Sequence, residues 1–160
     1  MPFISVLDSP LGKIVIKSNE KAVYYLSFEE PDEDENPNEL TEIARQEMKE
    51  YFDLKRIEFS FPVEQVGTPF QQKVWKELMN IQAGHPISYA SLSRRMNNPL
   101  AIRAIASANG KNRLAIVIPC HRVIGSSGDL VGYAGGLWRK KWLLDHEAKL
   151  TGKGQASLTF

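Results

Sequence analysis

Three short runs rich in β-branched and aromatic residues, all within the first 28 positions, constrain the fold of this chain more than any other feature. They lie at about residues 3–7, 13–17 and 23–28, and the segments DSPLG and SNEK between them have the composition of turns. We therefore predict three short strands joined by tight turns. An exposed acidic loop is expected at 31–39, followed by a helix over about 40–54 whose apolar residues recur at helical spacing.

The residues that follow Pro62 are predicted to be mainly helical. Thr68, Pro69 and Gln71 match the capping-box pattern, in which a threonine caps a helix that has proline at its first position. That helix is expected to end near Gly84. Further helices are expected over about 88–96, 99–110 and 137–150. The tight turn NNP joins the first two of these, so the sequence predicts a helix-turn-helix.

The predicted helix over 99–110, with Asn98 as its cap and Pro99 as its first residue, has an unusual surface. We expect the inward positions to be Ile102, Ile105 and Ala106, and the outward positions to be Ala101, Ala104, Ser107 and Ala108. A face of such small side chains allows the helix backbone to approach a partner closely, and Arg103 is the one long cationic side chain on it. The alternative is that alanine simply favours helix formation.

Charge is divided unevenly along the chain. Residues 1–62 hold 7 Lys and Arg against 14 Asp and Glu, a net charge of −7, whereas residues 63–160 hold 13 against 5, a net charge of +8. The basic part is a candidate surface for a polyanion such as nucleic acid, unless its charges are simply solvated. No apolar run reaches the roughly 18 residues needed to span a bilayer, and the first residues do not have the pattern of a signal peptide.

Cys120 is the only cysteine in the 160 residues, so the chain cannot form an internal disulfide, which is typical of reducing, intracellular compartments. It follows Pro119 at the end of an expected buried strand over 114–118, and it precedes His121 and Arg122. A base and a cation beside a thiol are expected to lower the pKa of the thiol. Because neighbours in an extended segment point to opposite faces, His121 needs a turn or a bridging water to reach Cys120. A buried structural cysteine is the alternative interpretation.

Two other kinds of site would use these residues. A metal site is not expected, because one cysteine and three widely spaced histidines show none of the usual zinc-ligand spacings. A cysteine hydrolase would need Cys120, His121 and Glu147 to form a relay. That interpretation leaves the basic second part and the helix with Arg103 unexplained.

Several motifs in the second part resemble one known family. IPCHRVIG, GYAGG and WLLDHE, with TPFQQKVWKEL, ISYASLS and AIRAIASANGKN upstream, run almost continuously from Thr68 to Ala148. In this pattern they resemble the DNA-protein-cysteine alkyltransferases that repair O6-alkylguanine. The resemblance implies an α+β fold, with a small N-terminal α/β unit of the ribonuclease H-like kind over 1–62, which has an antiparallel sheet. A mainly helical DNA-binding domain that contains the helix-turn-helix is implied over 67–150, and residues 151–160 are expected to form a loosely ordered tail.

The resemblance also implies a role for each residue around the thiol. Cys120 is expected to be the alkyl acceptor, and His121 the base that deprotonates it through a water molecule. Glu147 would orient His121, Asn112 would brace the turn that holds the thiol, and Tyr89 would hydrogen-bond the guanine and help it leave.

Further residues are implied for the DNA and for the damaged base. Arg103 is expected to enter the base stack when the nucleotide is flipped out, with Ala104, Ser107 and Arg122 also at the minor groove. The wall of the pocket over the base is assigned to Tyr133, Ala134, Gly135 and Val123. Some members of the family have serine where Ala134 stands, so only a backbone contact is expected there.

The implied activity is DNA repair by an irreversible, stoichiometric transfer of the alkyl group from O6-alkylguanine, and also from O4-alkylthymine, to Cys120. No cofactor and no metal are expected, and the expected partner is double-stranded DNA rather than a membrane. A monomer in the cytoplasm, or in the nucleus of a eukaryote, fits that activity. The main alternative is a non-enzymatic helix-turn-helix protein that senses alkylated bases, and the presence of Cys120 with His121 and Glu147 argues against it.

Overall fold

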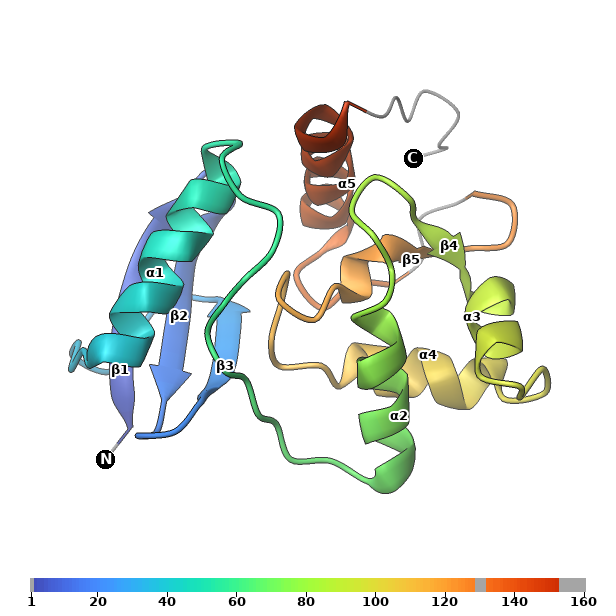
Figure 1. Ribbon diagram of the computed structural model, residues 1–160, viewed down its shortest axis with the longest axis horizontal. Helices are drawn as coiled ribbons and strands as arrows, with labels where there is room; N and C mark the ends of the chain where they lie inside the picture. Colours follow the sequence, from blue (N-terminus) through green and yellow to red (C-terminus); the bar gives the residue numbers. More distant parts are fainter. Residues whose placement is uncertain (1, 129–131, 153–160) are drawn as a thin grey trace. The chain divides into compact units, whose positions relative to one another are not determined.

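The computed structural model describes residues 2–128 and 132–152 (Figure 1). Within them the chain divides into two compact units. The first runs to Val66 and also includes Arg113–Ala115, and the second holds Gly67–Asn112 and the residues from Ile116 onward. The tail expected over 151–160 lies outside the described residues except for its first two positions.

In the first unit an antiparallel sheet carries one helix on its face, in agreement with the predicted fold class. The strands β1 (Phe3–Ser9), β2 (Gly12–Ser18) and β3 (Val23–Phe28) follow one another in space as they do in sequence. The helix α1 (Glu39–Phe52) packs against β1 and β2, and its buried face includes Ala44, Met48 and Tyr51. Asn38 caps it through a capping box with Thr41.

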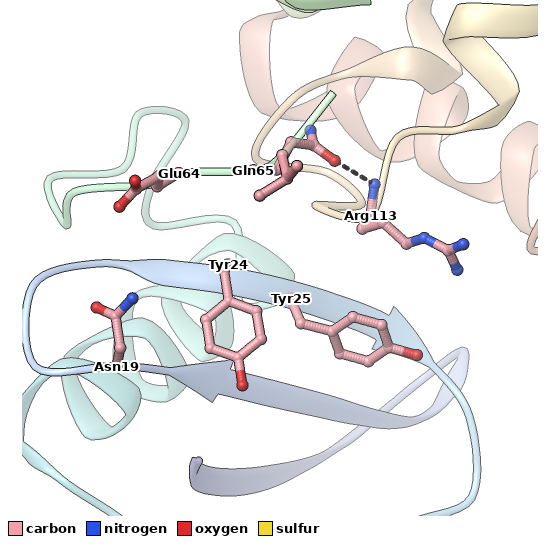
Figure 2. Close-up of a pocket in the computed structure, with 7 residues that line it drawn as sticks. Asn19, Tyr24, Tyr25, Glu64, Gln65 and Arg113 are labelled. Carbon is pink, nitrogen blue, oxygen red and sulfur yellow. Dashed lines mark hydrogen bonds between the residues drawn. The ribbon is translucent and has the colours of Figure 1, made fainter. Parts of the chain in front are cut away.

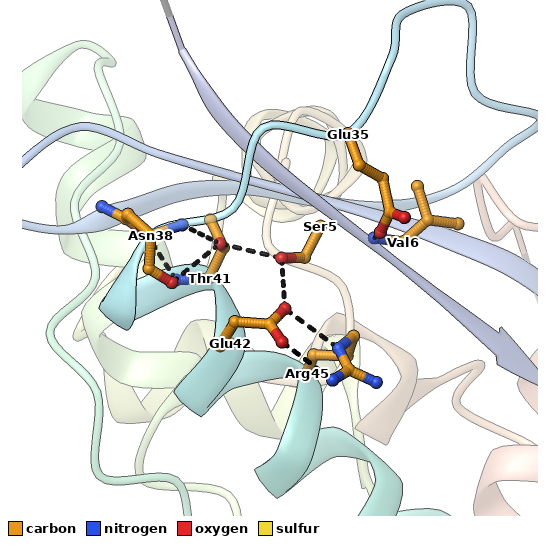
Figure 3. Close-up of polar contacts among 7 residues, drawn as sticks. All are labelled: Ser5, Val6, Glu35, Asn38, Thr41, Glu42 and Arg45. Carbon is orange, nitrogen blue, oxygen red and sulfur yellow. Dashed lines mark hydrogen bonds and ion pairs between the residues drawn. The ribbon is translucent and has the colours of Figure 1, made fainter.

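A polar network fastens α1 to β1 (Figure 3). The buried Ser5 hydroxyl donates to Glu42 Oε2 at 2.7 Å and lies 2.8 Å from Thr41 Oγ1. Glu42 also accepts two hydrogen bonds from Arg45, at 2.8 and 3.0 Å. These hydrogen bonds, first from Arg45 and then from Ser5, lower the pKa of Glu42 to about 2. The carboxylate therefore stays charged, and the network stays intact, at any ordinary pH.

The acidic loop covers the outer edge of β1. The amide of Val6 donates to Glu35 Oε1 at 2.8 Å, as Figure 3 shows for these two residues. Ile4 and Asn36 exchange two backbone hydrogen bonds, at 2.8 and 2.9 Å. An open strand edge would be able to pair with another chain, so this loop protects the sheet from such pairing.

An irregularity in β3 places two tyrosines on the wall of a pocket (Figure 2). The pairing of β2 with β3 changes register just after Lys17, and Tyr24 is left as an extra residue, as in a β-bulge. Tyr24 and Tyr25 are therefore both half-buried in a pocket of about 390 Å³. The side-chain oxygen of Gln65 accepts a hydrogen bond from the Arg113 amide, at 2.9 Å, in the same pocket. No sequence pattern in the first part indicates this pocket.

The second unit is mainly helical, as predicted. Its elements are, in chain order, α2 (Pro69–Leu78), β4 (Ile87–Ser88), α3 (Tyr89–Arg95), α4 (Ile102–Gly110), the 3-10 turn η1 (Cys120–Arg122), β5 (Val123–Ile124) and α5 (Leu137–Thr151). Thr68 caps α2 with the predicted capping box, α3 packs against α4, and β4 pairs in parallel with β5. No helix in residues 2–128 or 132–152 is both long and apolar enough to cross a lipid bilayer.

Three predictions about the backbone of the second part are wrong. The expected strand over 114–118 is mostly turns, because Ile116 has a left-handed backbone (φ 70°) that a strand does not allow. The helix expected from Pro99 begins only at Ile102, because the Ala101 amide closes a turn by donating to the Asn98 carbonyl at 3.1 Å. α2 ends at Leu78 rather than near Gly84, where the chain turns.

Gly67, just before α2, has no room for a side chain. A Cβ added there would meet the Trp75 ring at 2.5 and 2.6 Å. The ring cannot easily move aside, because it is buried and its Nε1–H donates to the Ala108 carbonyl at 2.9 Å. We predict that Gly67→Ala lowers the free energy of unfolding in urea titration by about 1–3 kcal/mol.

Gly110→Ala is the matched control, since a Cβ at Gly110 meets no atom within 4 Å. Alanine also favours the helical backbone, so this variant should be as stable as the wild type or slightly more stable. Equal losses of stability for the two variants would contradict the role given to the contact with Trp75.

Candidate active site

Cys120 lies at the start of a tight turn. The chain passes through the left-handed Ile116 and through Pro119, and then folds into η1. The Ile118 carbonyl accepts two hydrogen bonds, one from the Asn112 side chain and one from the Cys120 amide, both at 2.8 Å. These contacts support the bracing role expected of Asn112. The thiol residue itself is 8% exposed.

Three ionisable side chains beside the thiol form a buried cluster. His121 Nε2 lies 2.9 Å from Glu147 Oε2, and both side chains are fully buried. Arg122 forms a bidentate pair with Glu147, with both hydrogen bonds at 2.8 Å, and its Nη1 donates to the Ile81 carbonyl at 2.6 Å. One carboxylate therefore holds η1 against α5. In the described part of the chain, no group of three or more His, Cys, Asp or Glu side chains is placed to bind a metal ion.

Burial and charge act on this cluster in opposite directions. Burial alone would raise the pKa of Glu147, but the charges and hydrogen bonds of His121 and Arg122 outweigh it and hold that pKa well below its usual range. Burial is also the main cause that lowers the pKa of His121, although Glu147 opposes it. A neutral imidazole next to an ionised carboxylate is well placed to accept a proton.

The two expectations for Arg122 need correction. Its guanidinium is buried and bound by Glu147 and Ile81, so it does not provide the cation expected at the minor groove. Nor is the pKa of the thiol lowered by its neighbours in sequence. Burial raises the pKa of Cys120, and the smaller opposing effects come from the Asn112 hydrogen bond, from Lys140 and from the backbone.

Lys140 is a candidate functional residue that the sequence analysis missed. It is fully buried on α5, and its Nζ donates to the Gly132 carbonyl at 3.4 Å. Burial lowers the pKa of Lys140 to about 8, and its interaction with Cys120 opposes that shift. Nothing in the triplet RKK distinguishes this lysine from Arg139 and Lys141 on either side of it.

Cys120 opens into a pocket of about 340 Å³. Side chains from several elements line it, among them Tyr89, Asn109, Asn112, Tyr133 and Ala134. Two residues expected in the wall do not line it. Val123 is fully buried in the pairing of β5 with β4, and the Gly135 carbonyl accepts a hydrogen bond from Arg139 at 2.8 Å.

Asn109 connects two groups of this pocket, and the sequence analysis did not single it out. Its Nδ2 donates to the Tyr89 hydroxyl at 3.0 Å and to the Cys120 carbonyl at 3.4 Å. Asn109 is 5% exposed, and its Oδ1 has no hydrogen-bond partner within the described residues. The sequence feature that could have indicated Asn109 is its place four positions after the buried Ile105, which puts a polar residue on the inward face of α4.

The exposed face of α4 differs from the predicted one at two positions. Arg103, Ala104 and Ser107 are exposed, as a DNA-facing surface requires. Ile102, expected inside, is 40% exposed, whereas Ala108, expected outside, is buried. The reason is that α2 packs against α4 on the side of Ala108.

Comparisons with known proteins cover both units. The family model described as the ribonuclease-like domain of 6-O-methylguanine DNA methyltransferase matches residues 3–65, and the model described as its DNA binding domain matches residues 69–149. The constitutive methylated-DNA–protein-cysteine methyltransferase of Bacillus subtilis is 40% identical over 147 residues, which cover 84% of this chain and 88% of the relative. The methylated-DNA–protein-cysteine methyltransferase of Methanosarcina barkeri is 40% identical over 153 residues, covering 91% and 96%. The crystal structure of Mycobacterium tuberculosis OGT in complex with DNA matches with a TM-score of 0.83 and 36% identity, over 91% of this chain and 92% of that one.

Lys140→Met tests whether this lysine tunes the thiol. Its charge is one of the effects that lower the pKa of Cys120, so without it the thiolate should form only at higher pH. We predict that the pH profile for alkylation of the DNA-free protein by iodoacetamide moves to higher pH in this variant. The rate near pH 8 should then fall roughly three- to tenfold.

Lys141→Met is the matched control, because Lys141 is the exposed neighbour and pairs with Asp145 at 3.2 Å. The pH profile of alkylation in Lys141→Met should equal that of the wild type.

Stability gives a second test of Lys140. Because its pKa is lowered, the unfolded chain binds more protons than the folded one between pH about 8 and 10.5. Over that range the stability of the wild type relative to Lys140→Met should rise with pH. An unchanged thiol profile in Lys140→Met would contradict the tuning role.

Proposed function

The chain belongs to the 6-O-methylguanine DNA methyltransferase family, and from this we propose that Cys120 is the residue that accepts the alkyl group. The protein repairs DNA by transferring an alkyl group from O6-alkylguanine to a cysteine. The observation that carries the proposal is one juxtaposition. The only thiol of the sequence lines a pocket of about 340 Å³ and directly precedes the buried His121, which pairs with Glu147.

His121 acts in this proposal as the base that removes the thiol proton. Burial lowers the pKa of His121 and raises the pKa of Cys120, so the free protein holds a neutral imidazole and a protonated thiol. His121 Nδ1 has no hydrogen-bond partner within the described residues, and it receives the proton of Cys120 through a water molecule. Glu147, 2.9 Å from Nε2, then stabilises the imidazolium, while Lys140 stabilises the thiolate.

The thiolate displaces the guanine at the alkyl carbon. A sulfur–carbon bond forms as the bond from that carbon to O6 breaks, and the electron pair of the broken bond goes to the purine. Tyr89 assists this departure, because its oxygen accepts a hydrogen bond from Asn109 and its hydroxyl can donate a hydrogen bond to the negative charge that develops on the base. Burial raises the pKa of Tyr89, which keeps that hydrogen in place.

The transfer consumes the protein. Its product is a thioether, which has no carbonyl for water to attack, and the sequence holds no second thiol. Each molecule therefore transfers one alkyl group. This chemistry assigns the protein to the compartment that holds the DNA, the cytoplasm of a prokaryote or the nucleus of a eukaryote.

α4 is the proposed contact with double-stranded DNA. Its small exposed residues Ala104 and Ser107 let the backbone approach the minor groove, and Arg103 fills the gap that the flipped nucleotide leaves. The net charge of +8 over residues 63–160 adds attraction to the phosphates. Flipping is required because a thiolate cannot reach an alkyl carbon inside the stacked duplex.

Intact-protein mass spectrometry tests the acceptor. After incubation with excess duplex that contains O6-methylguanine, the mass should rise by one methyl group and no further. Peptide mapping should confine the added group to the peptide that holds Cys120. Cys120→Ser should bind the same duplex without gaining mass. An unmodified wild-type protein that binds the lesion tightly would instead support the sensor alternative.

Arg103→Ala separates base flipping from chemistry. Without the side chain that fills the gap, extrusion from a duplex becomes harder, whereas a single strand needs little extrusion. We predict that the single-turnover rate falls roughly ten- to hundredfold on duplex but less than about threefold on the same sequence as a single strand.

Arg95→Ala is the matched control, because Arg95 is an exposed arginine on α3 and its removal changes the net charge by the same amount. If removing this charge changes the rate, the change should be the same on duplex and on single-stranded DNA, and it should disappear at high salt. If Arg103→Ala also slowed both substrates equally, its proposed role in flipping would be refuted.

A further inference from the structure

Asn109 presents a hydrogen-bond acceptor that has no partner within the described residues, and Asn109 lines the pocket of Cys120. Its surroundings decide which end of the amide is oxygen. The other end faces the Cys120 carbonyl at 3.4 Å, and because a carbonyl can only accept, that end must be the nitrogen. The same nitrogen donates to the Tyr89 hydroxyl at 3.0 Å. These two contacts keep the amide from turning towards another partner.

A buried acceptor without a partner is unfavourable, so the site favours a ligand that donates to it. O6-alkylguanine has one such group. Alkylation of O6 removes the proton from N1, so the ring nitrogens N1, N3 and N7 all accept hydrogen bonds. Only the 2-amino group of the base still donates.

We propose that Asn109 Oδ1 accepts a hydrogen bond from the 2-amino group of the flipped O6-alkylguanine, which makes Asn109 a determinant of base specificity. The proposal rests on the function proposed above for this pocket. Asn109 is suited to the task because its amide is held at the opposite end by Tyr89 and by the Cys120 carbonyl. The residue that recognises the base is thus linked to the phenol that assists its departure and to the backbone of the nucleophile.

O4-alkylthymine offers no matching donor. Alkylation of O4 removes the proton from N3, and the remaining polar atoms of the ring, N3 and O2, are acceptors. A thymine lesion in this pocket would leave Asn109 Oδ1 buried and unpaired. The activity expected on O4-alkylthymine should therefore be much weaker than the activity on O6-alkylguanine.

The Tyr133 hydroxyl is a second buried polar group of the pocket without a hydrogen-bond partner in residues 2–128 and 132–152. A hydroxyl both donates and accepts, so it can satisfy a purine or a pyrimidine. Discrimination between them requires a group with one fixed character, which Asn109 Oδ1 has.

The test compares two bases that differ only in the 2-amino group. Single-turnover transfer to Cys120 is measured on duplexes with O6-methylguanine or with O6-methylhypoxanthine, which lacks that group. The wild type should react with O6-methylguanine at least about tenfold faster. Asn109→Leu replaces the amide with an apolar side chain of similar size, and its ratio of rates should be close to one. The disadvantage of O4-methylthymine relative to O6-methylguanine should also shrink in this variant.

The ratio of the two rates is the readout, because a merely structural role of Asn109 would not change it. Lost contacts with Tyr89 and Cys120 slow both reactions, and differences in base pairing affect wild type and variant equally. Asn109→Ala gives the same test if the leucine variant does not fold. A wild-type ratio close to one, or a ratio unchanged in the variants, would overturn the proposal. Failure of the proposed function looks different, because the wild type would then transfer no alkyl group to Cys120 from either base.

Discussion

The buried carboxylate of Glu147 is the constraint on which the reactive part of the structure depends. A carboxylate inside a protein is unfavourable unless it is paired, and here Arg122 supplies two hydrogen bonds while His121 lies 2.9 Å away. Removing one partner of such a pair typically costs about 3–5 kcal/mol, because the other charge is left uncompensated. The same carboxylate therefore holds η1 against α5 and orients the imidazole. A substitution of Glu147 would therefore affect both the stability of the fold and the orientation of His121.

Burial also limits the reactivity of the thiol in the free protein. It raises the pKa of Cys120, so in the free protein the nucleophile is masked by its own proton. The charge of Lys140 lowers the pKa of the thiol but does not outweigh burial. Burial also lowers the pKa of Lys140 to about 8, so this lysine loses its charge at higher pH. A residue that can react only once benefits from this balance. In the proposed mechanism the thiolate forms most readily where a base, a buried cation and a bound substrate meet.

Features set by neighbours in sequence could be predicted, whereas features set by distant contacts could not. The start of α2 was predicted because a capping box involves residues only three positions apart, and the segment IPCHRVIG identified the thiol. Ile116 lies in an apolar run that predicts a strand, yet its left-handed backbone arises where the chain turns into the site. The role of Arg122 was misjudged because its partner Glu147 is 25 positions away.

Lys140 and Asn109 were missed for a related reason. Each lies on a helix, and whether a helical residue is buried depends on which face meets the rest of the protein, which spacing within RKK or SANG does not determine. Both matter because a buried polar group must find a partner, and the sequence does not say where that partner lies. A polar residue at a core position of an otherwise well-formed helix is therefore a useful mark of a site, even though its role appears only with the pocket around it.

The three residues Arg113–Ala115, between α4 and the turn of Cys120, belong to the first unit. After α4 the chain enters the sheet of that unit, where the Leu26 amide donates to the Arg113 carbonyl and the Ala115 amide donates to the Leu26 carbonyl, at 2.9 and 3.0 Å. Directly afterwards it passes through Ile116 to the turn of Cys120. The segment before the nucleophile is thus anchored at β3 and again by Asn112 at Ile118. The left-handed backbone of Ile116 and the Asn112 hydrogen bond to Ile118 order the turn of Cys120 during folding, so DNA binding does not have to order it.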